Sequence, residues 1–353
     1  MSTARHAIYH GPGREFELAE RPLPPCGPGE LLVAVSLATI CGSDLHTVDG
    51  RRTTPTPGVL GHEGVGRVVA VGPGRDAAWL DARVTWTLAD SCGACAPCRE
   101  WDLPQKCAHL FKYGHAALAD GAGLNGCYAT HIMLRAGTTV IRVPEALADE
   151  VVAPANCALA TMVGATESLP VRCRVAVVQG AGLLGLYGCA LLRAQGVPRV
   201  LVVDRNPERL RWVTALGGEP VLDSALGLLG PGGADAVWEV TGAPAVVAEG
   251  LRLLRPGGYY AWLGMVHPDS ALALTGESII RGCLTVRGLH NYAPRHLAGA
   301  VDFLSRTDGR LPWRELAGPV FGLGELPAAL AAARTQRWAR VGIRPGVAQM
   351  LPK

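Results

Sequence analysis

Apolar residues follow two different rhythms along the chain. In the first third, the short apolar runs 31–35 and 66–71 are bounded by glycine and proline turns, which predicts β-strands. From residue 174 the pattern changes, because the run 174–179 is largely continuous, as expected for a strand buried on both faces of a parallel sheet. A helix is predicted from there to Ala194, followed by a second buried strand over residues 199–203.

Strands and helices continue to alternate through the middle of the chain. Asn206-Pro207 is a typical helix start, and Gly217-Gly218 ends that helix. Further strands are predicted at residues 235–240, 258–263 and 284–288. This alternation predicts a doubly wound α/β domain with a parallel sheet, behind a β-rich first third.

The most apolar stretch, residues 175–192, is not predicted to cross a membrane. It contains four glycines and ends at Arg193, so a strand, a tight turn and a buried helix explain it better. The C-terminal residues have a mixed character, with a predicted helix near 326–335 and a strand near 341–344.

Length, charge and cysteine usage narrow the possible classes of protein. A chain of 353 residues suggests two domains. The formal net charge is +3 and no basic run exceeds Arg51-Arg52, so we expect no nucleic-acid partner. Residues 1–21 lack the pattern of a secretory signal, and five of the eleven cysteines look like buried thiols in a reducing compartment. Both observations favour a cytoplasmic protein.

Four cysteines within sixteen residues form the clearest motif. Cys92, Cys95 and Cys98 have CxxCxxC spacing and Cys107 closes the cluster, which is typical of a tetrahedral four-thiolate zinc site. Such a site is structural, because four thiolates leave no position open for a substrate. A disulfide knot, an iron–sulfur site and unrelated buried thiols are the alternatives.

Three other residues suggest a second zinc ion. Cys41 and His62 lie 21 residues apart, and Cys157 follows just before the predicted α/β domain. Two thiolates and one imidazole leave the fourth tetrahedral position open, which makes a zinc site catalytic. Each residue alone is more often inert, so the prediction rests on the joint pattern.

A dinucleotide site is predicted between the first two buried strands. Gly180, Gly182 and Gly185 form GxGxxG after a strand and before a helix, whose N-terminus can bind a pyrophosphate. Asp204 ends the next strand, 24 residues after Gly180, where a carboxylate accepts from both ribose hydroxyls and repels a 2′-phosphate. NAD is therefore favoured over NADP, although Arg205 next to it would tolerate the phosphate. A glycine-rich packing turn is the alternative.

Over essentially its whole length the chain resembles the zinc-dependent medium-chain alcohol and polyol dehydrogenases. The resemblance rests on CGSDLH at 41–46, GHEGVGRVVAVG at 61–72, the CxxCxxC cluster, Cys157 with Thr161, GAGLLG at 180–185, and Asp204. It implies a GroES-like β-rich catalytic domain at 1–157, a Rossmann domain at 158–292, a C-terminal return to the catalytic domain at 293–353, and a homodimer or homotetramer.

The resemblance also implies roles for individual residues. Cys41, His62 and Cys157 bind the catalytic zinc, with Glu63 as a transient ligand, and Asp44 holds the far nitrogen of His62. Ser43 and His46 form a proton relay, while the cofactor contacts are Gly180, Gly182, Leu183, Leu184, Gly185, Asp204, Arg205, Thr161 and Arg340, the last near the diphosphate. The chain departs from the family where eight residues, rather than seven, separate Cys98 from Cys107, and where Thr130 replaces a common glutamate.

The implied reaction is hydride transfer between a small alcohol bound at zinc and NAD. A finer resemblance, carried by segments such as KYGH at 112–115 and HNYAPRHL at 290–297, is to a bacterial subgroup proposed to act in phosphonate metabolism. It implies a hydroxyalkylphosphonate substrate, with anion contacts at Lys112, His115, His290 and Arg295.

Several alternatives stay open at this point. A neutral polyol, cyclitol or secondary alcohol is the alternative substrate. A zinc-free reductase of quinones or enones, and a non-catalytic NAD-binding or zinc-ribbon protein, are alternatives of other classes.

Overall fold

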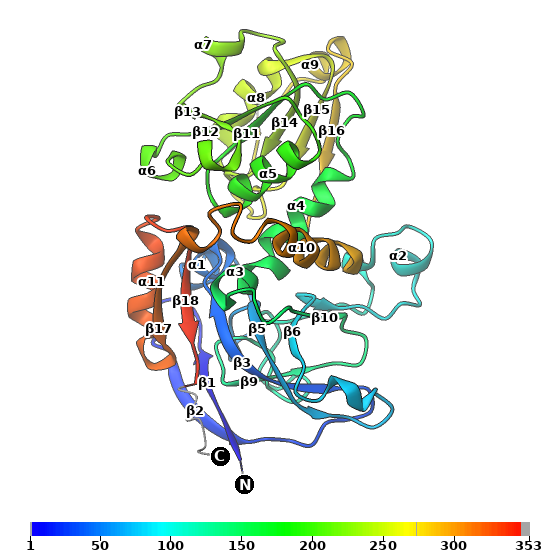
Figure 1. Cartoon of the computed structure of the whole chain (residues 1–353), viewed down its shortest axis with the longest axis vertical. Helices are drawn as coiled ribbons and strands as arrows, with labels where there is room; N and C mark the ends of the chain where they lie inside the picture. The colour runs from blue at the N-terminus through cyan, green and yellow to red at the C-terminus, as the bar shows by residue number, and fades with distance from the viewer. Residues whose placement is uncertain (1, 273, 347–353) are drawn as a thin grey trace. The chain divides into compact units, whose positions relative to one another are not determined.

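The computed structural model describes residues 2–272 and 274–346, which divide into two compact units. The first unit holds the residues up to Cys157, Tyr292–Asp308 and the residues from Trp313 onward. The second holds Ala158–Asn291 together with Gly309–Pro312. Figure 1 shows the predominantly β-stranded first unit and the mixed helix–sheet second unit.

The first unit is built on a seven-stranded sheet with the order β10-β6-β5-β3-β18-β17, in which β9 also pairs with β3. These strands are β3 (Leu31–Thr39), β5 (Glu63–Val71), β6 (Arg83–Trp86), β9 (His131–Leu134), β10 (Val140–Arg142), β17 (Ala317–Gly322) and β18 (Arg340–Arg344). A three-stranded sheet contains β1 (Thr3–Tyr9), β2 (Glu17–Pro22) and β4 (Gly58–Val59), and a small ribbon pairs β7 (Ala89–Asp90) with β8 (Phe111–Lys112).

Short helices connect and cover these strands. The α-helices are α1 (Gly42–Val48), α2 (Ala96–Arg99), α3 (Asp149–Val152), α10 (Pro294–Thr307) and α11 (Leu326–Arg334). The 3₁₀ turns are η1 (Ala77–Trp79), η2 (Pro104–Lys106), η3 (Ala153–Asn156), η6 (Arg314–Leu316) and η7 (Leu323–Glu325). Helix α11 packs against β17 and β18 (Figure 1), and the core of the unit includes the fully buried rings of Trp86, Tyr113 and Tyr128.

The C-terminal strand joins the N-terminal part of the chain. In the antiparallel pair of β18 and β3, Gly342 lies opposite Thr39, and the Ile40 amide donates to the Val341 carbonyl at 2.9 Å. Arg340, the first residue of β18, is thereby brought to the end of β3, next to the residues that follow it.

The second unit is the predicted doubly wound domain. Its parallel sheet has the order β13-β12-β11-β14-β15-β16, made of β11 (Val175–Gln179), β12 (Arg199–Asp204), β13 (Glu219–Leu222), β14 (Ala234–Glu239), β15 (Leu254–Trp262) and β16 (Thr285–Gly288). The order reverses between β11 and β14, where sheets of this type bind ligands at the carboxyl ends of the strands.

Helices of the second unit flank this sheet. They are α4 (Ala158–Thr166), α5 (Leu183–Ala194), α6 (Pro207–Leu210), α7 (Leu226–Leu229), α8 (Val247–Leu253) and α9 (Gly276–Arg281), with 3₁₀ turns η4 (Thr214–Leu216) and η5 (Pro244–Val246). The apolar stretch 175–192 is divided between β11 and α5, and no helix in residues 2–272 and 274–346 has the length and apolar character needed to cross a bilayer.

The predicted strands are confirmed, whereas one predicted helix is interrupted. The helix expected between Asn206 and Gly217 is only the four-residue α6, followed by a turn and η4. The Asn206 side chain caps it as expected, accepting from the Glu208 amide at 3.0 Å. The following amides bond to carbonyls three residues back, as from Val213 to Leu210 at 3.0 Å, which tightens the chain before Gly217 takes a φ of 82°. Helix α10 was not predicted.

Candidate active site

One cluster in the first unit combines the expected ligands of the catalytic zinc. Ligand atoms of Cys41, His62, Glu63 and Cys157 all lie within 4.8 Å of one another. Cys41 precedes α1, His62 and Glu63 begin β5, and Cys157 follows η3. Two thiols, an imidazole and a carboxylate are the donors that zinc takes in proteins, so the residues present fit a zinc ion.

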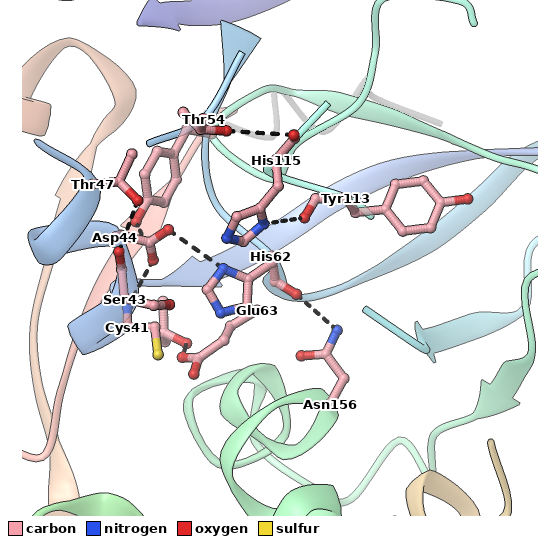
Figure 2. A network of polar contacts seen from close by, with 12 residues as sticks. Cys41, Ser43, Asp44, Thr47, Thr54, His62, Glu63, Tyr113, His115 and Asn156 are labelled. Carbon is pink, nitrogen blue, oxygen red and sulfur yellow. Dashed lines mark hydrogen bonds and ion pairs between the residues drawn. The ribbon is translucent and has the colours of Figure 1, made fainter. Parts of the chain in front are cut away.

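His62 is held at both its side chain and its backbone (Figure 2). Its Nδ1 lies 3.4 Å from Asp44 Oδ1, and its backbone carbonyl accepts from Asn156 Nδ2 at 3.0 Å. Asp44 Oδ2 also accepts from the Cys41 amide at 2.9 Å and from the Tyr128 hydroxyl at 3.1 Å. One buried carboxylate thus touches two of the ligand residues, the arrangement by which outer partners orient metal ligands.

The charges around His62 change its proton affinity. Burial alone would lower the pKa of His62, but Asp44 and Cys41 outweigh it and raise the pKa to about 10. A metal ion bound by this imidazole has to displace a proton. The hydrogen bond between the two thiols lowers the pKa of Cys41 and raises that of Cys157.

Glu63 is held by a buried ion pair that the sequence did not predict. Arg340 donates from Nε to Glu63 Oε2 at 2.8 Å and from Nη2 to Oε1 at 2.9 Å, while its Nη2 lies 3.7 Å from Cys41 Sγ. Thr39 donates to Glu63 Oε2 at 2.5 Å. Burial raises the pKa of Glu63 to about 7 despite the opposing effect of Arg340. Arg340, expected near the cofactor diphosphate, is therefore a partner of Glu63 in this structure.

The predicted relay residues lie on α1. Ser43 and His46 are both half-buried. Residues three apart on a helix share a face, so the spacing allows a proton to pass between groups on one side of α1. The role of the two side chains remains a prediction.

The four cysteines of the lobe lie together in the first unit. Sγ of Cys95 is 3.4 Å from Sγ of Cys98 and 3.7 Å from that of Cys107, and the ligand atoms of all four residues are within 4.8 Å. Backbone amides point at the sulfurs, as from Cys92 to Cys107 at 3.2 Å and from Cys95 to Cys92 at 3.4 Å. All of these cysteines are free thiols. Sulfurs that accept amide hydrogen bonds suit thiolate ligands, so this cluster fits a structural zinc.

The loop with the extra residue includes α2 and η2. Asp102 between them has a φ of 51°, and its carboxylate pairs with Arg295 Nη1 at 2.9 Å. Thr130 Oγ1 accepts from the Arg5 amide at 3.0 Å.

The glycine-rich turn in the second unit has the expected form. Gly180 has a φ of 113°, and a Cβ at Gly185 would lie 1.8 Å from the Gly180 carbonyl oxygen, so both positions require glycine. A Cβ at Gly182 would meet nothing within 4 Å, which leaves space in front of the α5 N-terminus formed by Leu183 and Leu184.

The Asp204 carboxylate faces this turn. Asp204 Oδ2 accepts from the Ala181 amide at 2.8 Å and Oδ1 from the Asn206 amide at 2.9 Å. Each carboxylate oxygen keeps a lone pair for a ribose hydroxyl. Arg209 Nη1 lies 3.8 Å from Asp204 Oδ2. Of the other predicted cofactor contacts, Arg205 is exposed and Thr161 is half-buried on α4.

Comparison with known proteins identifies the family. Residues 27–145 match the family "Alcohol dehydrogenase GroES-like domain" and residues 184–306 match "Zinc-binding dehydrogenase". The chain is 30% identical over 287 residues to the L-threonine 3-dehydrogenase of Bacillus subtilis, covering 77% of this chain and 79% of that protein. It is 29% identical to the 5-exo-hydroxycamphor dehydrogenase of Pseudomonas putida, covering 94% and 95%.

A solved structure supports the same conclusion. The alcohol dehydrogenase of Thermotoga maritima superposes with a TM-score of 0.89 at 28% identity, covering 98% of this chain and 100% of that one. The chain belongs to the zinc-dependent medium-chain dehydrogenase family. It is a zinc-dependent alcohol dehydrogenase that uses NAD(P), with a GroES-like and a Rossmann domain and two zinc sites. The zinc-free and non-catalytic alternatives are wrong.

Proposed function

We propose that the protein interconverts a small alcohol and its carbonyl form with NAD, and that the substrate carries an anionic group such as a phosphonate. The observation that supports the anionic group is the placement of Lys112 beside the ligands of the catalytic zinc. The expectation from sequence resemblance and the charge distribution around Lys112 agree on this class of substrate.

Lys112 is a cation without a matching carboxylate. It lies on β8, opposite Ala89 of β7, and is half-buried. Within residues 2–272 and 274–346 its ammonium group makes no hydrogen bond or ion pair. Burial and the positive charge of Arg52 lower the pKa of Lys112 to about 8, and the charges of Cys157 and Cys41 oppose this effect. Lys112 is thus close enough to Cys41 and Cys157 to interact with them electrostatically, and Arg52 is close enough to interact with Lys112.

The charge balance of the site favours an anion. A bound zinc ion offsets the charge of two thiolates, while Arg340 offsets Glu63. The Asp44 carboxylate beside His62 offsets only one of the two positive charges of Lys112 and Arg52, so the site keeps an excess positive charge. Clustered donors of this kind recognise phosphonate, phosphate or carboxylate groups.

His115 contributes a different kind of contact. Its ring centroid lies 5.2 Å from that of His62, and its Nδ1 is 2.9 Å from the Tyr113 carbonyl oxygen. Burial, His62 and Lys112 hold the pKa of His115 well below its ordinary value, so it offers a neutral ring rather than a cation. Arg295, which pairs with Asp102, and His290, an exposed residue of the second unit, are not included in this anion site.

The chain's own residues have distinct tasks in the reaction. When bound, zinc acidifies the substrate alcohol and NAD accepts the hydride. The Ser43 hydroxyl takes the alcohol proton and His46 passes it toward solvent, while Asp44 keeps His62 oriented. The Asp204 carboxylate accepts from the adenosine ribose hydroxyls and disfavours a 2′-phosphate, which selects NAD.

The test is the rate of NADH formation by the zinc-loaded enzyme on hydroxyalkylphosphonates and on neutral diols, polyols and cyclitols. Lys112→Met and Arg52→Gln remove one positive charge each, whereas Arg51→Gln removes the charge of the exposed neighbour and is the matched control. Losing a charge-assisted hydrogen bond of about 1.5–3 kcal/mol lowers kcat/KM for the phosphonate by roughly 10- to 150-fold. The rate on neutral alcohols should change little, and equal losses on both substrate types would contradict the proposed anion site.

A neutral secondary alcohol is the second candidate. It is favoured by the similarity, over 94% of this chain, to a protein named 5-exo-hydroxycamphor dehydrogenase, whose named substrate carries no charge. The relative named L-threonine 3-dehydrogenase points the other way, because threonine is a small secondary alcohol with a carboxylate. Turnover of neutral alcohols alone would select the second candidate and leave the zinc chemistry intact.

A further inference from the structure

A buried carboxylate in the second unit lies outside every role described so far. Glu239 ends β14, is 0% exposed, and pairs with no cation among the described residues. A carboxylate buried without a cation is costly unless hydrogen bonds compensate it. The donors that compensate Glu239 come from two loops at the carboxyl edge of the sheet.

Those loops follow β14 and β15. Glu239 Oε1 accepts from the Thr241 amide at 2.6 Å, the Thr241 hydroxyl at 2.7 Å and the Gly242 amide at 2.7 Å. Its Oε2 accepts from the Gly264 amide at 3.2 Å. A Cβ at Gly264 would lie 2.4 Å from the Gly242 nitrogen, so the two loops are packed directly against each other on the carboxylate.

The same loops border the place where the cofactor is expected. The strand order reverses between β11 and β14, and Gly180 follows the first of these strands as Glu239 ends the second. A Cβ at Gly180 would lie 3.0 Å from Thr241 Cγ2, so the side chain of Thr241 packs on the glycine-rich turn. Thr241 is itself exposed at this edge. The buried carboxylate is therefore linked to the dinucleotide turn through Thr241, which it holds by hydrogen bonds from both the amide and the hydroxyl.

We infer that Glu239 is a positioning residue for the cofactor, which fixes the 241–242 loop against the glycine-rich turn, with Gly264 packed behind that loop, before the dinucleotide binds. Because the 241–242 loop is already ordered, cofactor binding does not have to order it. The expected effect of Glu239 is therefore on cofactor affinity. This inference is independent of which alcohol the enzyme oxidises, because it concerns the second unit alone.

The test compares two carboxylates on the same strand. Glu239→Gln keeps the shape of the side chain but replaces one of its two acceptor oxygens by an NH₂ group. In either orientation that NH₂ group meets an N–H or O–H that now donates to Glu239. Asp235→Asn is the matched control at the opposite end of β14, where Asp235 accepts from the Arg174 and Val175 amides at 2.8 and 2.9 Å. The measurement is the dissociation constant for NADH of the zinc-loaded full-length enzyme, by fluorescence titration, alongside Tm.

Glu239→Gln should raise the NADH dissociation constant by about tenfold or more, and the KM for cofactor with it, while the KM for the alcohol stays unchanged. Asp235→Asn should lower Tm and leave the dissociation constant unchanged. If Glu239→Gln lowers Tm but binds NADH like the wild type, Glu239 has only a structural role and the inference is wrong.

A second pair of variants covers the case in which Glu239→Gln does not fold. Thr241→Val keeps the methyl group beside Gly180 but removes the hydroxyl that donates to Glu239, and Thr241→Ser keeps that hydroxyl. The valine variant should bind NADH several-fold more weakly than the serine variant, about 1 kcal/mol for one hydrogen bond. Equal dissociation constants for the two variants would overturn the inference.

Discussion

Replacing Asp44 by asparagine removes a buried carboxylate that contacts two zinc-ligand residues, His62 and Cys41. Asp44 is 2% exposed, and its two oxygens face the His62 ring on one side and the Cys41 amide with the Tyr128 hydroxyl on the other. Asparagine has the same shape but only one acceptor oxygen. In either orientation its NH₂ group meets a group that now donates to the carboxylate.

The magnitude follows from the loss of an outer partner of a metal-binding imidazole. Such losses weaken metal binding by about 10- to 100-fold, or about 1.4–2.8 kcal/mol. We expect a chelator to remove the catalytic zinc from Asp44→Asn at about 10- to 100-fold lower concentration than from the wild-type enzyme. Activity should be lost in parallel with the zinc.

The assay is zinc release under chelator competition, followed by metal analysis and turnover. The four-cysteine zinc should stay bound in Asp44→Asn, because its ligands form a separate cluster. Tyr128→Phe is the control, since it removes one hydrogen bond to Asp44 without touching the 3.4 Å contact with His62. An Asp44→Asn enzyme that holds its catalytic zinc as tightly as the wild type would refute the reasoning.

Three further predictions concern other parts of the molecule. Cys95→Ala should lower Tm strongly, because structural zinc in small zinc-binding domains contributes about 10 kcal/mol or more to folding, and an unchanged Tm would argue against that role. Asp204→Ser removes the carboxylate that faces the Ala181 amide, and should raise kcat/KM with NADP relative to NAD; an unchanged ratio of the two would count against Asp204 as the selector. Arg340→Met leaves Glu63 buried without its cation and should cost about 3–5 kcal/mol in urea unfolding, whereas Glu63→Gln combined with Arg340→Met should recover part of that loss.

The parts of the site that depend on local spacing could be predicted from the sequence. Cys92, Cys95 and Cys98 come together because they are three residues apart, and Gly180, Gly182 and Gly185 shape one turn. The buried strands of the second unit also follow directly from their continuous apolar runs. Cys157 belongs to the same zinc cluster as Cys41, but only the resemblance to a family connected residues so far apart in the chain.

The partners contributed by distant strands could not be predicted. Arg340 reaches Glu63 across 277 residues, because β18 pairs with β3, and its residue type alone gives no sign of that pairing. Asn156 was missed because a single asparagine before a cysteine has no distinctive pattern. Arg52 is half-buried whereas the adjacent Arg51 is exposed, and two neighbouring arginines give no sequence signal for that difference. Helix α10 was missed although Pro294 at its first position is a helix-start signal.

Metal content measured together with turnover tests the central claim most directly. The wild-type enzyme should hold two zinc ions per chain and form NADH from an alcohol. Cys41→Ala should hold the four-cysteine zinc alone, bind NADH like the wild type, and form no product. A Cys41→Ala enzyme that still turns over the alcohol would contradict the assignment of the reaction to the zinc held by Cys41, His62 and Cys157.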